Sequence, residues 1–336
     1  MPLLVNPNQA LLFIHAPKCG GSSVVDTFEC NGYEIEFQIR GKPPQNYLKV
    51  SPQHQTCSTI KSLVRLENIS NVFIVTRSPY DRIQSEYNWT FRNVPKEKRM
   101  PYNEWVLSSL AKASVSPSYA DNHFLPIVDF LDVDIPTEIF RLEDGLELIY
   151  EYYIQMPYSV HNIPTFHRKK SSSFQYVDKT CTLDVRALEA VNEFYKLDFL
   201  AFDYEQKVAN KSYLVTESTN MCTAQISQKI KKIKSWRINT IKLLFEKLKI
   251  QRNFLFSKLS EMSDSILEET SSENCNTEKE IEFLQANNKN LFLRTELMCA
   301  NPSTLANKDD YAKFSLEISR TWRIINECRL YISQLK

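Results

Sequence analysis

The sequence predicts an α/β protein in which a central parallel sheet is covered by helices on both faces, followed by an all-helical C-terminal region. Strand-like apolar runs at 11–15, 46–51, 72–76 and 138–142 alternate with helical stretches, as in a three-layer fold. From residue 226 onward, isoleucine and leucine recur at steps of three and four residues, which predicts a long amphipathic helix. Ligands of such a sheet are expected at the carboxyl ends of its strands.

The composition is that of a globular protein. The 336 residues are 43% hydrophobic, enough for one large core and an accessory region, and the net charge of +1 argues against nucleic acid as a partner. The eight cysteines include no C-x-x-C pair, so neither a zinc site nor a disulfide framework is indicated. Reduced thiols in a cytoplasm are the simpler interpretation.

The N-terminal residues "MPLLVNPNQA" lead directly into the first predicted strand. They contain no basic segment followed by an apolar stretch, and no membrane-spanning run follows in the chain. We therefore expect a cytoplasmic protein without an integral membrane segment.

The first strand leads into a glycine pair within "LLFIHAPKCGGSSVVDTF", residues 11–28, in a chain with only five glycines. The pattern predicts a strand, a tight loop and a helix that begins near Ser22. The unpaired N–H groups of the first helical turn can then bind a phosphate, which Gly20 and Gly21 allow to approach closely. The alternative is an ordinary turn in which Ser22 caps the helix and Lys18 is solvated.

The position of the lysine separates two classes of phosphate loop. In nucleoside-triphosphate loops the lysine follows the second glycine, whereas Lys18 precedes both glycines, which disfavours a kinase. The order P-K-x-G-G-[ST]-S instead resembles the 5′-phosphosulfate loop of the sulfotransferases, P-loop-like enzymes that use 3′-phosphoadenosine 5′-phosphosulfate (PAPS). The resemblance implies a cofactor-binding loop composed of Pro17, Lys18, Cys19, Gly20, Gly21, Ser22 and Ser23.

The same resemblance implies a second strand-to-helix junction that carries an arginine and, eight residues later, a serine for the 3′-phosphate. "NVFIVTRSPYDRIQSEYNW" supplies both, with Arg77 at the end of a predicted strand and Ser85 inside a helix that begins near Pro79. A forked guanidinium suits a dianionic phosphate.

Three further stretches are similar to the bacterial, heparan-sulfate 2-O- and chondroitin-type branch of carbohydrate sulfotransferases. "DNHFLPIVDFL" resembles an H-x-x-P-Q segment in which Ile127 replaces the glutamine, "EIFRLED" resembles a buried strand that ends in acids, and "VNEFYKLDFLAFDYE" resembles the segment that closes the domain. The resemblance covers about residues 8–206. We therefore expect a PAPS-dependent sulfotransferase domain at 1–206.

The remaining residues, 207–336, are predicted to form a helical accessory region. A polar linker at 206–222 precedes the long helix, and further helices are expected at 278–299 and 308–334. Its apolar stripes require burial, so we expect it to contribute to acceptor binding or to homodimer formation.

A basic segment, "SVHNIPTFHRKKSSS", resembles the family's flexible segment over the cofactor. The resemblance implies that Arg168 and Lys169, with Lys170, contact the 3′-phosphate. A solvated loop is the alternative.

The reaction requires a base, because an acceptor hydroxyl loses its proton as it attacks sulfur. His54 is the first candidate, since it follows "NYLKVSPQ" at the end of the second predicted strand, where heparan-type relatives carry their catalytic histidine. His123 is the second candidate, either as the base or as an acceptor-orienting residue, and Lys18 is expected to stabilise charge on the leaving phosphate. His15, at the end of the first predicted strand and next to the glycine loop, is expected to be a buried structural residue rather than the base.

These features together predict in-line transfer of a sulfuryl group from PAPS to a hydroxyl of a carbohydrate or small molecule, without a metal. The absence of a signal anchor, which eukaryotic relatives of this branch carry, favours a bacterial cytoplasmic enzyme. The alternatives are a P-loop small-molecule kinase and a non-catalytic nucleotide-fold scaffold whose helices bind a partner.

Overall fold

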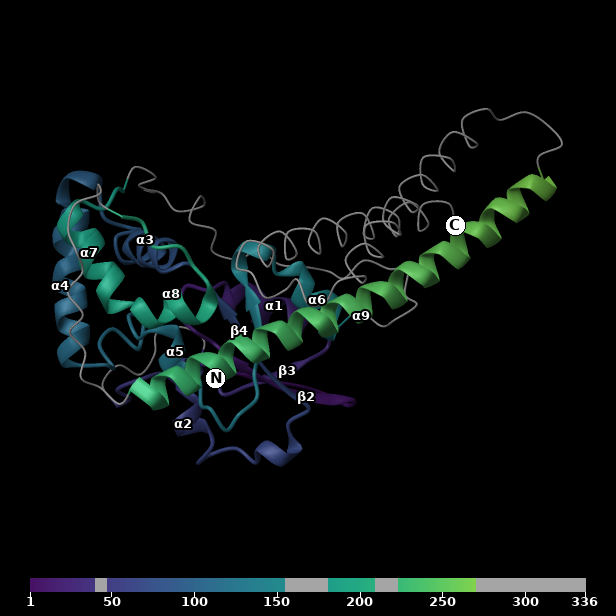
Figure 1. Cartoon of the computed structure of the whole chain (residues 1–336), viewed down its shortest axis with the longest axis horizontal. Coiled ribbons are helices and arrows are strands. Elements are labelled where there is room, and N and C mark those ends of the chain that lie inside the picture. The colour runs from purple at the N-terminus through teal and green to yellow at the C-terminus, as the bar shows by residue number, and fades with distance from the viewer. Residues whose placement is uncertain (40–46, 155–180, 209–222, 270–336) are drawn as a thin grey trace. The chain divides into compact units, whose positions relative to one another are not determined.

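The structure is a computed structural model that describes residues 1–39, 47–154, 181–208 and 223–269 (Figure 1). Five strands form one sheet: β1 (Leu3–Asn6), β2 (Gln9–Ile14), β3 (Glu34–Glu36), β4 (Asn71–Thr76) and β5 (Glu138–Arg141). The helices are α1 (Gly21–Cys30), α2 (Cys57–Ile60), α3 (Pro79–Thr90), α4 (Tyr102–Val115), α5 (Ile127–Phe130), α6 (Glu147–Tyr153), α7 (Val185–Phe194), α8 (Lys196–Phe202) and α9 (Thr223–Glu269). Short 3₁₀ turns include η1 (Pro52–His54) and η4 (Leu142–Asp144).

The sheet is mixed, with the strand order β3-β1-β2-β4-β5. Strands β2, β4 and β5 are parallel neighbours, which confirms three of the predicted strands. Strands β1 and β3 extend the sheet in antiparallel pairings that the sequence analysis did not predict. Because the three parallel strands end at one edge, the loops after Ile14, Thr76 and Arg141 gather there.

The predicted strand at 46–51 is wrong over its described part, since residues 47–51 form turns and bends. The apolar residues that suggested a strand are exposed, Tyr47 by 87% and Leu48 by 45%. The backbone N–H of Ser51 donates to the carboxylate of Asp121 instead of to a neighbouring strand. His54 is therefore placed by the 3₁₀ turn η1 and not by the end of a strand.

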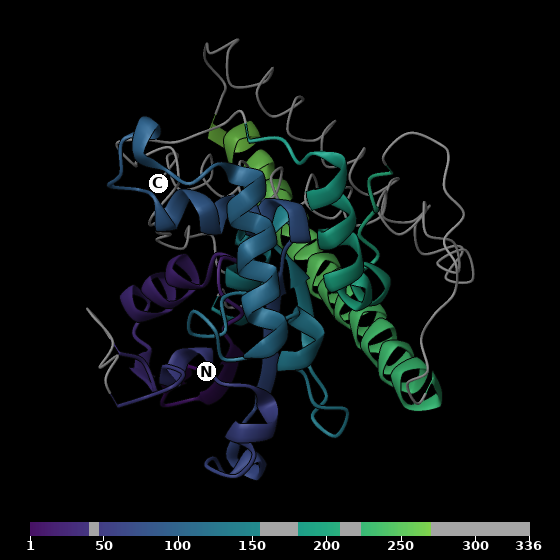
Figure 2. The same cartoon turned by 90° about the vertical axis from the view of Figure 1, so that its left-hand side faces the viewer.

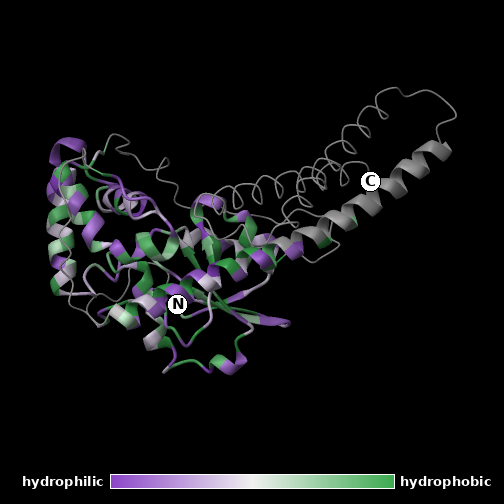
Figure 3. Cartoon of the chain, in the orientation of Figure 1, coloured by the Kyte–Doolittle hydropathy of each residue, from purple (hydrophilic) through white to green (hydrophobic). Residues whose placement is uncertain are grey.

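The core lies between the sheet and its helices. Phe13 of β2 stacks on Phe73 of β4 with ring centroids 4.9 Å apart, and Phe28 of α1 packs against Phe73 at 6.1 Å. All three rings are at most 1% exposed, and each such burial stabilises the fold by about 1.5–3 kcal/mol. The hydropathy colouring shows largely hydrophobic strands, whereas hydrophobic and hydrophilic residues are mixed along α4 (Figure 3).

The helices pack in pairs around this core. Helix α1 contacts β1 and β3, α3 contacts α4, and α7 contacts both α4 and α8. Figure 2 shows α1 in purple beside the N-terminal strands. No described helix combines the length and apolar character needed to cross a membrane.

The chain divides into two compact units, one from Met1–Glu143 and Thr165–Thr240 and the other from Asp144–Pro164 and Ile241–Lys336. The predicted long helix is confirmed as α9, and its residues up to Thr240 belong to the unit that contains the sheet. There, Thr240 accepts a 2.9 Å hydrogen bond from the backbone N–H of Ile139, and the buried Arg237 forms an ion pair with Asp203. The helices predicted at 278–299 and 308–334 lie outside the described residues.

Candidate functional site

The glycine pair forms the predicted strand, loop and helix unit between β2 and α1. Lys18 has a φ of 66° and Gly20 a φ of 84°, so the loop turns through two left-handed residues. Gly20 is the N-cap residue of α1, no side chain caps the helix, and its first turn contains no acidic residue. The alternative in which Ser22 caps the helix is therefore wrong. An uncapped helix N-terminus suits a phosphate, because its N–H groups are available as donors and the glycine before them lets the phosphate approach.

The other loop residues support this geometry in different ways. Pro17 and Ser23 are buried, Ser22 is half-buried, and the Pro17 carbonyl accepts a 3.1 Å hydrogen bond from Nε of Arg82. Cys19 is 1% exposed, and burial raises the pKa of its thiol to about 12. The thiol is therefore protonated at neutral pH and is not a nucleophile.

Arg77 joins the second predicted junction to the first. It follows the last residue of β4, and its Nη1 donates a 3.1 Å hydrogen bond to the carbonyl of Lys18. The next residue, Ser78, donates its backbone N–H to Oε1 of Glu143 at 2.7 Å. Ser85 lies half-buried in the second turn of α3. The two loops that the resemblance assigns to the 5′- and 3′-phosphates are thus in direct contact.

Lys18 rests on an aromatic ring of the same site. Its Nζ lies 4.6 Å from the centroid of the Trp89 ring, and the guanidinium carbon of Arg92 lies 3.9 Å from the same centroid. A cation over an indole face is stabilised by the ring quadrupole. The side chain of Lys18 is therefore held against α3. We call its own loop, residues 17–23, the phosphate loop, after the role that the sequence resemblance implies.

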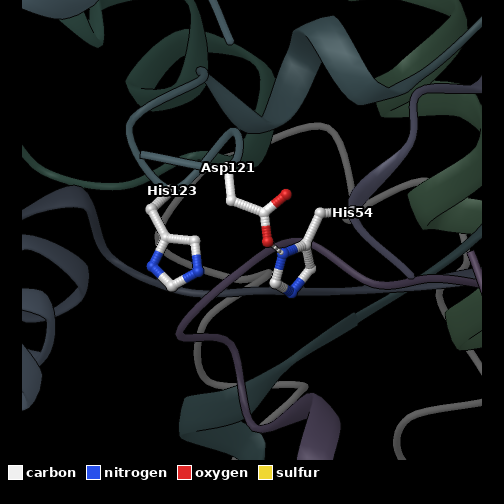
Figure 4. A group of neighbouring side chains, drawn as sticks. All are labelled: His54, Asp121 and His123. Carbon is white, nitrogen blue, oxygen red and sulfur yellow. Dashed lines mark hydrogen bonds and ion pairs between the residues drawn. The ribbon is translucent and has the colours of Figure 1, made fainter. Parts of the chain in front are cut away.

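His54 forms a hydrogen-bonded pair with a carboxylate. Its Nδ1 lies 2.8 Å from Oδ2 of Asp121 (Figure 4). Ser51 Oγ donates to the same oxygen at 2.7 Å. The carbonyl of His54 accepts a 2.9 Å hydrogen bond from the side chain of Asn122. These contacts fix both the ring and the backbone of His54.

The electrostatics of this pair favour a neutral imidazole. Burial lowers the pKa of His54 to about 4, and the hydrogen bond to Asp121 only partly opposes it. Burial alone would raise the pKa of Asp121, but its bonds with His54 and Ser51 lower it to about 2. At neutral pH Nδ1 of His54 carries the proton that Asp121 accepts, which leaves Nε2 as a hydrogen-bond acceptor.

His123 forms a second pair of the same kind with an acid on α3. Its Nδ1 lies 2.7 Å from Oε2 of Glu86, and its ring centroid lies 5.1 Å from that of His54. Burial alone would raise the pKa of Glu86, but His123, Lys18 and Arg82 lower it to about 2. Glu86 therefore links the second histidine electrostatically to the phosphate loop.

His54, Asp121 and His123 each offer one ligand atom, and these atoms lie within 4.8 Å of one another. In Figure 4 the Asp121 carboxylate lies between the two rings and points at His54. Oδ2 of Asp121 already accepts from both His54 and Ser51, so a metal would have to displace these hydrogen bonds. We call these three residues the proton-handling cluster, after the role proposed for them below.

Three charged residues of the site were not found from the sequence: Arg82, Glu86 and Asp121. Arg82 is 2% exposed and donates to the carbonyls of Pro17 and His123, so it ties the phosphate loop to the loop that carries the second histidine. No spacing rule identifies it. The position of Asp121, two residues before His123, was the available signal. The predicted cofactor-binding residues Arg168 and Lys169, with Lys170, His161 and His167, lie outside the described residues.

The fold and site define an α/β protein that presents an uncapped helix N-terminus beside a buried histidine–carboxylate pair. The family model described as the sulfotransferase family matches residues 1–205, and the chain belongs to that family. No curated protein and no solved structure matches it.

Proposed function

We propose that the protein transfers a sulfuryl group from PAPS to a hydroxyl group of an acceptor, with His54 as the general base. The observation that carries the proposal is the closeness of the base to the phosphate loop. The backbone of Gly21 packs against the ring of His15, and the centroid of that ring lies 5.0 Å from the centroid of His54. A base so near the first turn of α1 can reach a hydroxyl that attacks a group bound there.

The loop residues fit the donor. The uncapped N-terminus of α1 suits the 5′-phosphosulfate, and the guanidinium of Arg77 suits the 3′-phosphate. PAPS supplies an activated sulfuryl group whose leaving group is adenosine 3′,5′-bisphosphate. Binding at the helix terminus would place the scissile bond at the edge of the sheet where Lys18 and the two histidines gather.

His54 presents an unprotonated ring nitrogen at neutral pH. Asp121 holds the proton of Nδ1, so Nε2 is the free acceptor, and a pKa of about 4 keeps the ring neutral at pH 7. The acceptor hydroxyl gives its proton to Nε2 while its oxygen forms a bond to sulfur. In the same step the bond between sulfur and the 5′-phosphate oxygen breaks, and that oxygen takes the negative charge.

Lys18 stabilises the charge that develops on the leaving group. Its Nζ lies over Trp89, from where the four-carbon stem lets it turn toward the helix terminus. Phosphoryl and sulfuryl transfer both depend on such cations, because negative charge accumulates on oxygens in the transition state.

The acceptor in this proposal is a carbohydrate, as in the heparan-sulfate 2-O- and chondroitin-type branch. Support comes from the resemblance of residues 121–131 to that branch. The proposal leaves His123 to orient the acceptor hydroxyl next to His54.

The test is to incubate the full chain with PAPS and a panel of carbohydrate and small-molecule hydroxyl acceptors, followed by mass spectrometry. We expect one acceptor class to gain a sulfuryl group in step with release of adenosine 3′,5′-bisphosphate, and the variant His54→Ala to form little product. Release of bisphosphate at the same rate with and without every acceptor, and with no sulfated product, would contradict the proposal.

A further inference from the structure

His15 lies between the phosphate loop and the proposed base. It follows the last residue of β2 and is 8% exposed. Its ring stacks on Phe13, with centroids 5.3 Å apart, and meets the ring of His54 edge-on at 5.0 Å. The rings of His54 and His123 make a second edge-on contact at 5.1 Å, so the three histidine rings form a row. The row therefore runs from the end of β2 into the proton-handling cluster.

The other side of the His15 ring faces the second glycine of the loop. A Cβ atom added at Gly21 would lie 2.0 Å from Nε2 of His15 and 2.1 Å from its Cδ2, far inside any real contact. The described glycines with a positive φ are Gly20, Gly32 and Gly145, so the backbone conformation does not require a glycine at 21. The ring of His15 does require one, since it occupies the space of the missing side chain.

We propose that His15 is a positioning residue that holds the base His54 at a fixed place relative to the phosphate loop, and that residue 21 is glycine to admit its ring. This inference rests on the proposed function, in which His54 acts on a group bound at α1. Close-packed rings transmit displacement, so any shift of the first turn of α1 moves His15 and, through it, His54.

The surroundings of His54 make its titration a measure of this packing. The titratable groups that face it are Asp121, His123 and the amino group of Met1, and the ring of His15 closes a further side. Burial is the main cause of its low pKa. A smaller residue at position 15 admits water and raises that pKa, whereas an aromatic replacement keeps the site closed.

The ordinary explanation of Gly21 is that it lets the phosphate approach the backbone. The two explanations differ in a double-mutant cycle. If phosphate approach is the reason, Gly21→Ala weakens ligand binding whether or not His15 is present. If the ring is the reason, the added methyl group is harmful only while a ring occupies position 15.

The experiment compares Gly21→Ala, His15→Ala and the double variant in the full chain, with His15→Asn in case His15→Ala does not fold. Adenosine 3′,5′-bisphosphate is titrated by calorimetry, and the histidines, of which the chain has five, are titrated by NMR after isotope labelling. We expect His15→Ala to bind the bisphosphate within about 3-fold of the parent chain, and Gly21→Ala to weaken binding only while the His15 ring is present, so that the double variant binds like His15→Ala. We expect Gly21→Ala to lower the melting temperature and shift the His54 resonances, and His15→Ala to raise the pKa of His54 from about 4 toward 6.5.

In the His15→Ala background, Gly21→Ala should change neither the melting temperature nor the His54 resonances. His15→Phe should retain the low pKa of His54, and Phe28→Leu, a core change on the same helix, is the matched control that lowers stability without altering that pKa. A bisphosphate affinity that falls more than about 10-fold with Gly21→Ala in both backgrounds, or a pKa of His54 unchanged by His15→Ala, would overturn the inference. Failure of the parent chain to bind the bisphosphate would instead contradict the proposed function. The inference about His15 would still be tested in that case, because the NMR titration of the histidines needs no ligand.

Discussion

The phosphate loop is one continuous segment between β2 and α1, whereas the proposed base site joins two loops, which carry His54 and Asp121 and lie 67 residues apart in the sequence. The loop takes its shape from backbone conformation, with a left-handed residue at Gly20 and an uncapped helix behind it. The base site takes its shape from buried side-chain hydrogen bonds. The first kind of site is encoded locally, and the second exists only in the folded chain.

Replacement of the base should give the largest effect and should separate the two regions most clearly. We expect His54→Ala to lower turnover by roughly 10²–10⁴-fold, the usual contribution of a positioned general base, and to leave bisphosphate affinity nearly unchanged. Turnover with a sulfated-product assay and affinity by calorimetry measure the two effects. Unchanged turnover would assign the role of base to His123, for which His123→Ala is the companion variant.

The partner of the base should have the next largest effect. Asp121→Asn retains the shape of the side chain but removes the charge that accepts from Nδ1 of His54 and from Ser51. We expect turnover to fall at least on the order of 100-fold, because the imidazole loses the carboxylate that fixes its tautomer and orientation, with bisphosphate affinity retained. A loss in affinity as large as the loss in turnover would show that the two regions are not independent.

The sequence predicted the phosphate loop more completely than the surroundings of His54. The loop, Arg77 at the end of β4 and the start of α3 at Pro79 were all predicted, because glycine, proline and strand periodicity act locally. His54 was selected through resemblance, but its predicted strand was wrong because Tyr47 and Leu48 are exposed. Asp121 and Glu86 were missed, since the chain has 40 acidic residues and no local pattern shows which of them meets a histidine.

A substitution at Arg77 tests whether the region around the phosphate loop binds the nucleotide. We expect Arg77→Ala to weaken adenosine 3′,5′-bisphosphate by about 10–100-fold, the effect of losing charge-assisted hydrogen bonds, and to weaken adenosine 5′-phosphate less. Competition binding with the two nucleotides measures the difference. Equal weakening of both would mean that Arg77 only supports the carbonyl of Lys18, with which it is hydrogen-bonded.

The pH dependence should distinguish a buried base from an exposed one. Because burial holds the pKa of His54 at about 4, kcat/KM for the donor should be nearly constant from pH 7 to pH 5, whereas a histidine with a pKa of 6.5 would lose roughly 25-fold. An acid limb near pH 6.5 would contradict the burial of His54.

The stability of the fold should decrease as the pH falls, because the pKa values of His54 and Glu86 are lowered in the folded state. The folded pKa of His54 lies below 6.5, so its contribution is present above that pH and is lost as the pH falls toward 4. Glu86, with a folded pKa of about 2, adds a loss as the pH falls below 4.5. The melting temperature should therefore decrease steadily on acidification, and less steeply in Glu86→Gln.

We expect the loop after β2 and Arg77 after β4 to form together one site for a nucleotide with phosphates at both the 3′ and 5′ positions. Calorimetric and thermal-shift titrations of the parent chain with adenosine 3′,5′-bisphosphate and with ATP test it most directly. We expect the bisphosphate to bind and, at a hundred times its Kd, to stabilise the fold by about 2.7 kcal/mol, which raises the melting temperature. ATP at the same concentration should raise the melting temperature much less. Equal shifts with the two nucleotides would contradict it.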